Sequence, residues 1–174
     1  MNFSKIEKIT EDLLKSQNIC SVDEINLKKV CKSMNINLKS EDLDDDISGL
    51  FVVKEDSYFI RYNKRQPKTR KRFTIAHELG HYVLHKNIPL FVDKTGAKVL
   101  YRDNNSSTGE VKREREANAF AASLLMPAKF IESEINKIPD DMDEVIEYLA
   151  ERFNVSLQAM TYRLANLNYD IGYF

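Results

Sequence analysis

The sequence predicts an α+β fold in which a small, mostly antiparallel sheet packs on a histidine-bearing helix and its neighbouring helices. Two observations predict this class. Residues 47–53 and 58–62 are rich in β-branched and aromatic side chains, as strands are, whereas residues 73–85 and 110–125 look helical. The 174 residues fit one domain with a small appendage. We expect residues 1–126 to form the main domain and residues 127–174 to form a three-helix segment packed on it.

Composition argues against several classes of protein. The net charge of −1 gives the chain as a whole no electrostatic attraction to nucleic acid or anionic lipid. No apolar run approaches the roughly 20 residues that span a bilayer, and the first residues lack the apolar core of a signal peptide. Cys20 and Cys31 are too few for a disulfide scaffold. We therefore expect a cytoplasmic protein with reduced thiols and no membrane contact.

The N-terminal half is expected to begin with helices and continue into strands. The first forty residues look helical, with one helix around Ile6 to Leu14 and a short one near residues 26–34. The acidic stretch 41–46 is expected to be a solvated loop. Residues 47–53 and 58–62 form a predicted β-hairpin with its turn at residues 54–57. The basic stretch 63–72 contains Pro67 and is read as a loop leading into a helix, with a nucleic-acid patch as the lesser alternative.

The C-terminal half is predicted to be mainly helical. Residues 91–103 are expected to form a second hairpin, and residues 104–109 a polar loop. The helix at 110–125 ends before Pro127, which can occupy the first position of the next helix. Three further helices are expected at about 127–137, 141–153 and 156–167, with Ser156 as the N-cap of the last.

The strongest chemical signal is the segment His77-Glu78-Leu79-Gly80-His81. On a helix, residues four apart lie on the same face, so both imidazoles can reach one cation. The glutamate beside the first histidine can act as a general base without binding the metal. The preceding residues are apolar, which indicates an interior site, and we expect Gly80 to clear room close to the metal. The alternative is a helix with two surface histidines matched by chance.

The third metal ligand must come from outside this pair. His85 is about 12 Å from His77 along a helix axis, so both cannot bind one zinc ion. We expect His85 to act at the helix end, as a cap or as a partner of a ligand. The remaining candidates are carboxylates of the helix at 110–125.

Helix geometry favours Glu114 as this ligand, with Glu116 as the alternative. Glu114 begins a stripe of small and apolar residues that can pack tightly on the histidine helix; its other members are Ala117, Asn118, Ala121 and Leu125. Glu116 points about 160° away from Glu114. We expect Asn118 to hold a ligating imidazole by its other ring nitrogen.

Two imidazoles and one carboxylate would leave the fourth position of a zinc ion open for water, as in catalytic zinc sites. Zinc lowers the pKa of such a water to about 7, and Glu78 would take its proton during attack on a peptide carbonyl. The donor for the developing oxyanion is left open among Tyr82, Tyr101 and several arginines.

Two long segments resemble the ImmA/IrrE family of metallopeptidases. These are Arg72–His85 (RFTIAHELGHYVLH) and Glu114–Pro127 (EREANAFAASLLMP), and residues 47–50 and 58–63 also resemble the family's strands. The resemblance implies a zinc endopeptidase with His77, His81 and Glu114 as ligands and Glu78 as the catalytic base. It also implies a protein substrate, a helix-turn-helix transcriptional repressor that controls stress or mobile-element genes.

Residues 148–164 resemble the family's helix-turn-helix-like segment. We favour a packing role for these helices because the last one offers Arg163 as its only cation, and phosphate contacts dominate non-specific DNA affinity. The competing hypothesis is a non-enzymatic, zinc-containing regulator that binds DNA or a repressor through residues 127–174. A metallohydrolase of small molecules is a third reading, which a zinc site alone does not exclude.

Overall fold

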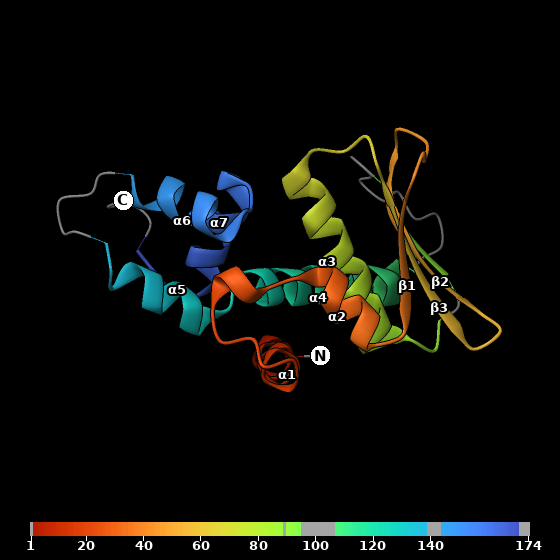
Figure 1. Ribbon diagram of the computed structural model, residues 1–174, viewed down its shortest axis with the longest axis horizontal. Coiled ribbons are helices and arrows are strands. Elements are labelled where there is room, and N and C mark those ends of the chain that lie inside the picture. The colour runs from red at the N-terminus through yellow and green to blue at the C-terminus, as the bar shows by residue number, and fades with distance from the viewer. Residues whose placement is uncertain (1, 89, 95–106, 139–143, 171–174) are drawn as a thin grey trace.

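A small sheet at one end of the molecule is joined to a group of short helices at the other end by the long helix α4 (Figure 1). The computed structural model describes residues 2–88, 90–94, 107–138 and 144–170. The α+β class predicted from the sequence is confirmed. No helix within these ranges is both long and apolar enough to cross a membrane.

The sheet has four strands in the order β1-β3-β2-β4. β2 (Ile47–Lys54) and β3 (Ser57–Asn63) form the predicted hairpin, and both turn residues, Glu55 and Asp56, have positive φ angles of 49° and 57°. Such turns match the right-handed twist of the strands. β4 (Leu90–Lys94) pairs antiparallel with β2, so two of the three pairings are antiparallel, as expected. The rest of the predicted second hairpin lies outside the described residues.

β1 (Ile36–Glu41) corrects the expectation that the first forty residues are helical. It pairs in parallel with β3, and Ile36 faces Tyr58 in the register. Four of its six side chains are polar, and the strand lies at the edge of the sheet. The conformation of β1 is therefore determined by its pairing with β3 rather than by a local sequence pattern.

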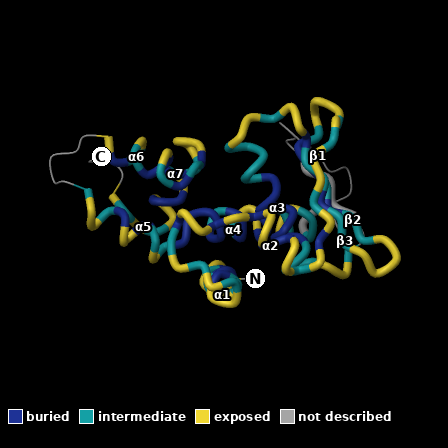
Figure 2. Tube along the Cα trace, viewed as in Figure 1, coloured by how far each residue is buried: buried dark blue, intermediate teal, exposed yellow. Residues whose placement is uncertain are grey.

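Helix α3 (Lys68–His85) lies between the sheet and α4 (Ser107–Leu125), because it contacts β2, β3 and α4. All residues from Thr74 to His81 are buried, so this part of α3 is covered on every side, as Figure 2 shows by its dark blue colour. α3 begins five residues before the predicted Phe73. α4 begins at Ser107, inside the predicted polar loop 104–109, so the last three residues of that predicted loop are helical instead.

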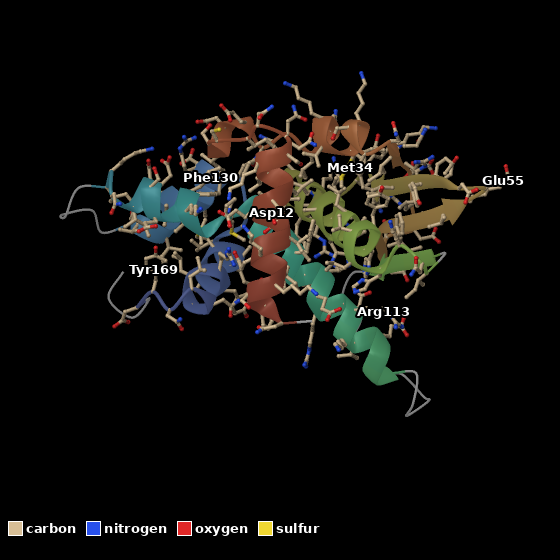
Figure 3. The ribbon with its side chains drawn as sticks, turned by 90° about the horizontal axis from the view of Figure 1, so that it is seen from below. Asp12, Met34, Glu55, Arg113, Phe130 and Tyr169 are labelled. Carbon is tan, nitrogen blue, oxygen red and sulfur yellow. The ribbon has the colours of Figure 1, made fainter. Side chains whose placement is uncertain are left out.

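The N-terminal helices cover α4 and the sheet edge. α1 (Phe3–Ser16) packs across α4, where Figure 3 marks it by Asp12, and the Thr10 and Ser123 hydroxyls hydrogen-bond at 2.6 Å. A short 3-10 turn, η1 (Val22–Glu24), leads to α2 (Leu27–Ser33), which contacts β1 and α3. These helices agree closely with the two predicted N-terminal helices.

Three short helices follow α4: α5 (Ala128–Ile135), α6 (Val145–Phe153) and α7 (Leu157–Asn166). Pro127 precedes α5 with an extended ψ of 133°, so it stands before the first helical position rather than in it. The Ser156 hydroxyl accepts a hydrogen bond from the Ala159 amide at 3.2 Å, which makes it the predicted N-cap of α7. Residues 139–143, which include the expected start of the second helix, are not described.

The Arg163 side chain connects α7 to the rest of the fold. Its guanidinium donates to the Met126 carbonyl oxygen at 2.9 Å and to both carboxylate oxygens of Glu7 at 2.5 and 3.0 Å. One buried side chain thus joins the first helix, the end of α4 and the last described helix.

Candidate metal centre

The two histidines of the motif lie side by side on α3 and are almost fully buried. Their Nε2 atoms are 3.0 Å apart, and the residues expose 3% (His77) and 1% (His81) of their surface. The one-turn spacing produces this convergence, because residues four apart on a helix share a face.

Glu114 of α4 completes the group. Its carboxylate oxygens lie 3.2 Å from His77 Nε2 and 3.3 Å from His81 Nε2, and its side chain is 32% exposed. The donor atoms of the three residues all fall within 4.8 Å of one another, close enough to hold one metal ion. Glu116, the alternative candidate, does not join this cluster; its Oε2 lies 2.9 Å from His85 Nε2.

The close approach of α4 depends on Gly80. A Cβ atom at this position would lie 3.1 Å from the Cα and carbonyl oxygen of Ala117 and 3.2 Å from the Cβ of Phe120. The expectation that Gly80 clears room for a metal is therefore wrong, because the space beside it holds the backbone of α4. Ala117 and Ala121 are fully buried at this contact, so the small-residue stripe of α4 packs as predicted.

Asn118 orients the imidazole of His77. Its Oδ1 lies 3.0 Å from His77 Nδ1, and because an amide oxygen only accepts, the imidazole donates from Nδ1. A neutral His77 then carries its lone pair on Nε2, which faces His81 and Glu114. Metal-binding histidines are commonly held in this way by a partner of the non-binding nitrogen.

The charge state of the cluster suits a divalent cation. Burial lowers the pKa of His81 to about 4, and the neighbouring imidazoles of His77 and His85 act in the same direction against the opposing effect of Glu114. Burial opposes ionisation of Glu114, but the imidazoles of His77 and His81 against its carboxylate outweigh it and lower the pKa of this carboxyl. At neutral pH the cluster therefore offers an unprotonated imidazole and a carboxylate, which are the forms that bind metal.

Glu78 points from α3 toward the sheet and is fully buried. A Cβ atom at Gly49 of β2 would lie 3.4 Å from Glu78 Oε1 and 2.3 Å from Thr74 Cγ2, so only glycine fits there without displacement. The sequence prediction gave Gly49 no role. A glycine inside a strand, which often marks a close approach of another group, was the available signal.

Of the two tyrosines considered as oxyanion donors, the structure describes Tyr82 and not Tyr101. The Tyr82 ring packs edge-on against Tyr58 and Phe51, with ring centroids 4.7 and 6.0 Å away. Burial, together with Tyr58, raises the pKa of Tyr82, so its hydroxyl keeps its proton at neutral pH. Tyr101 lies outside the described residues.

Comparison with known proteins agrees with this geometry. The family model described as the IrrE N-terminal-like domain matches residues 31–165. The metallopeptidase ImmA of Bacillus subtilis is 30% identical over 144 residues, which cover 82% of this chain and 76% of that protein. The chain belongs to the ImmA/IrrE family of metallopeptidases.

A solved structure extends the similarity of fold. A transcriptional regulator of Mycobacterium tuberculosis superposes with a TM-score of 0.68 at 18% identity, over 98% of this chain. The chain spans about half of that protein, since the match covers 49% of its length. This ImmA/IrrE family member therefore shares its fold with a part of a larger regulator.

Proposed function

We propose that this ImmA/IrrE family metallopeptidase is a zinc-dependent endopeptidase whose metal ligands are His77, His81 and Glu114. The observation that carries the proposal is the convergence of these three donor groups within 4.8 Å in a member of a metallopeptidase family. Two imidazoles and one carboxylate are a common ligand set of catalytic zinc. The contact of Glu116 with His85 supports Glu114 over Glu116 as the third ligand.

The chain's own groups would divide the hydrolytic work. Zinc, when bound, supplies Lewis acidity and makes water easier to deprotonate. Glu78, next to His77 on α3, would take the proton of the attacking water on a carboxylate oxygen and deliver it to the departing amide nitrogen. Asn118 would keep Nδ1 of His77 occupied by a proton, so that Nε2 stays available to the metal.

The substrate we propose is a helix-turn-helix transcriptional repressor in the cytoplasm. The resemblance of both sequence motifs to the ImmA/IrrE family supports this choice. The free thiols of Cys20 and Cys31 are compatible with a reducing compartment. Residues 1–126 would form the metallopeptidase domain, and residues 127–174 a helical segment attached through contacts such as that of Arg163 with Met126.

The competing function, a regulator that binds DNA through its C-terminal helices, finds less support. α7 has Arg163 as its one cation, and that side chain is 5% exposed and paired with Glu7. A buried, paired guanidinium is poorly placed to contact a phosphate. A gel-shift assay at physiological salt tests this alternative; binding that survives removal of zinc would favour it.

The proposed activity is tested with Glu78→Gln, which keeps the shape of the side chain and removes the base. The variant should bind one zinc ion as the wild type does and should fail to cut the repressor encoded in the same locus, as read by mass spectrometry. Glu132→Gln, at an exposed position of α5, is the matched control and should cut normally. Cleavage by Glu78→Gln at the wild-type rate would show that Glu78 is not the base.

A further inference from the structure

His85, one turn beyond the histidine pair, lies between a candidate ligand and a carboxylate. Its Nδ1 is 3.4 Å from Nδ1 of His81, and its Nε2 is 2.9 Å from Oε2 of Glu116. Both side chains are largely buried, with 8% (His85) and 11% (Glu116) exposed. A carboxylate withdrawn from water to this degree needs a hydrogen-bonding partner, and His85 provides one.

The direction of these hydrogen bonds follows from the chemistry of the groups. An ionised carboxylate only accepts, so His85 donates to Glu116 from Nε2. A neutral His85 then has its lone pair on Nδ1, which can accept a hydrogen bond from Nδ1 of His81. His81 with its proton on Nδ1 carries its own lone pair on Nε2, the atom that faces His77 and Glu114.

A proton on Nδ1 of His81 competes with the alternative tautomer, in which the proton lies on Nε2. Glu114 Oε1 lies 3.3 Å from His81 Nε2, and an acceptor at that distance favours a proton on Nε2. A proton there would occupy the lone pair that a metal requires. An acceptor on the opposite side of the ring is therefore needed to hold the proton at Nδ1, and the described structure places His85 there.

We propose that His85 and Glu116 are positioning residues that fix His81 in the tautomer able to bind metal. The inference deepens the proposed function and rests on it for the identity of the metal. Helix α4 then serves both histidines: Asn118 holds His77 directly, and Glu116 holds His81 through His85. The same helix would also supply the third metal ligand, Glu114.

Substitutions at His85 separate this role from simple packing. In His85→Gln, the side-chain amide can still donate to Glu116 and accept from His81, whereas His85→Leu can do neither. Loss of such a partner typically weakens metal binding by about 10- to 100-fold. We expect that loss of zinc affinity, measured by competition with a chelator, in His85→Leu, and a much smaller one in His85→Gln.

Leu84→Ala is the control for packing, since Leu84 is a partly buried neighbour on the same turn. It should lower the free energy of unfolding and leave zinc affinity unchanged. An equal loss of affinity in Leu84→Ala and His85→Leu would overturn the proposal, as would wild-type affinity in His85→Leu.

A second measurement needs neither zinc nor a substrate. The chain has three histidines, so ¹⁵N NMR of the imidazoles can be assigned by single substitutions. We expect His85 to carry its proton on Nε2 in the metal-free full chain and to lose this preference in Glu116→Leu. A proton on Nδ1 of His85 would refute the relay even if the chain proves to be an active peptidase. If the chain is inactive, the expected spectrum would still support the relay.

Discussion

Replacement of Gly80 by alanine tests whether the contact of α3 with α4 determines the site. Alanine at a helix-interior glycine ordinarily stabilises by about 1 kcal/mol. Here the added Cβ would meet two atoms of Ala117, its Cα and its carbonyl oxygen, at 3.1 Å and Phe120 Cβ at 3.2 Å. Two of these atoms belong to the backbone of α4, so relief requires movement of a helix, and overpacking of this kind costs about 1–3 kcal/mol. We expect a net loss of about 1 kcal/mol.

The loss is measured by urea unfolding of the metal-free chain. Gly109→Ala is the matched control, because it is also a helical glycine and its nearest contact is the flexible end of Arg113 at 3.4 Å. That control should be neutral or stabilising. Gly80→Ala should also bind zinc more weakly, because Glu114 moves with α4. If Gly80→Ala stabilised the chain as much as Gly109→Ala, the argument for a helix contact limited by Gly80 would be refuted.

Two further predictions concern stability. Between pH 6.5 and 4 the unfolded chain binds more protons than the folded one, because the pKa of His81 falls to about 4 on folding. Its contribution is thus present at high pH and lost as pH falls, by about 2 kcal/mol from pH 7.5 to pH 5 in the metal-free chain. Constant stability in urea titrations across this range would contradict the shift of His81. Glu114, with its lowered pKa, acts in the same direction, but only as pH falls below its ordinary value of 4.5. Arg163→Leu should cost about 2 kcal/mol, because it leaves the Met126 carbonyl oxygen and the half-exposed Glu7 carboxylate without this partner. The exposed Tyr162→Ala should change little, and equal effects of the two variants in thermal unfolding would refute a stabilising role for the Arg163 contacts.

The sequence predicts those parts of the fold that depend on residues close together in the chain. The hairpin of β2 and β3, the helices around the two motifs, and the N-cap at Ser156 each follow from residues close together in the chain. β1 was missed because its conformation depends on parallel pairing with β3 across an intervening segment. The first turn of α3 was missed because Lys68 and its basic neighbours have no apolar periodicity, although they are helical.

In the candidate site, too, the features that depend on local spacing were predicted, and the contacts between separate elements were not. The spacing of His77 and His81 and the stripe that begins at Glu114 were visible in the sequence, and the structure brings these residues together. The contact between His85 and Glu116 was not foreseen, since helix periodicity shows which way Glu116 points and not what another helix places there. The roles of Gly80 and Gly49 likewise depend on the backbone or side chain that packs against each glycine.

The proposed activity requires that one zinc ion binds between α3 and α4 through His77, His81 and Glu114. A crystal structure of the zinc-loaded chain, with the ion located by its anomalous scattering, tests this most directly. We expect one ion with Nε2 of each histidine and a carboxylate oxygen of Glu114 at about 2.0–2.2 Å. Zinc held by Glu116 instead of Glu114, or bound away from the two histidines, would contradict it.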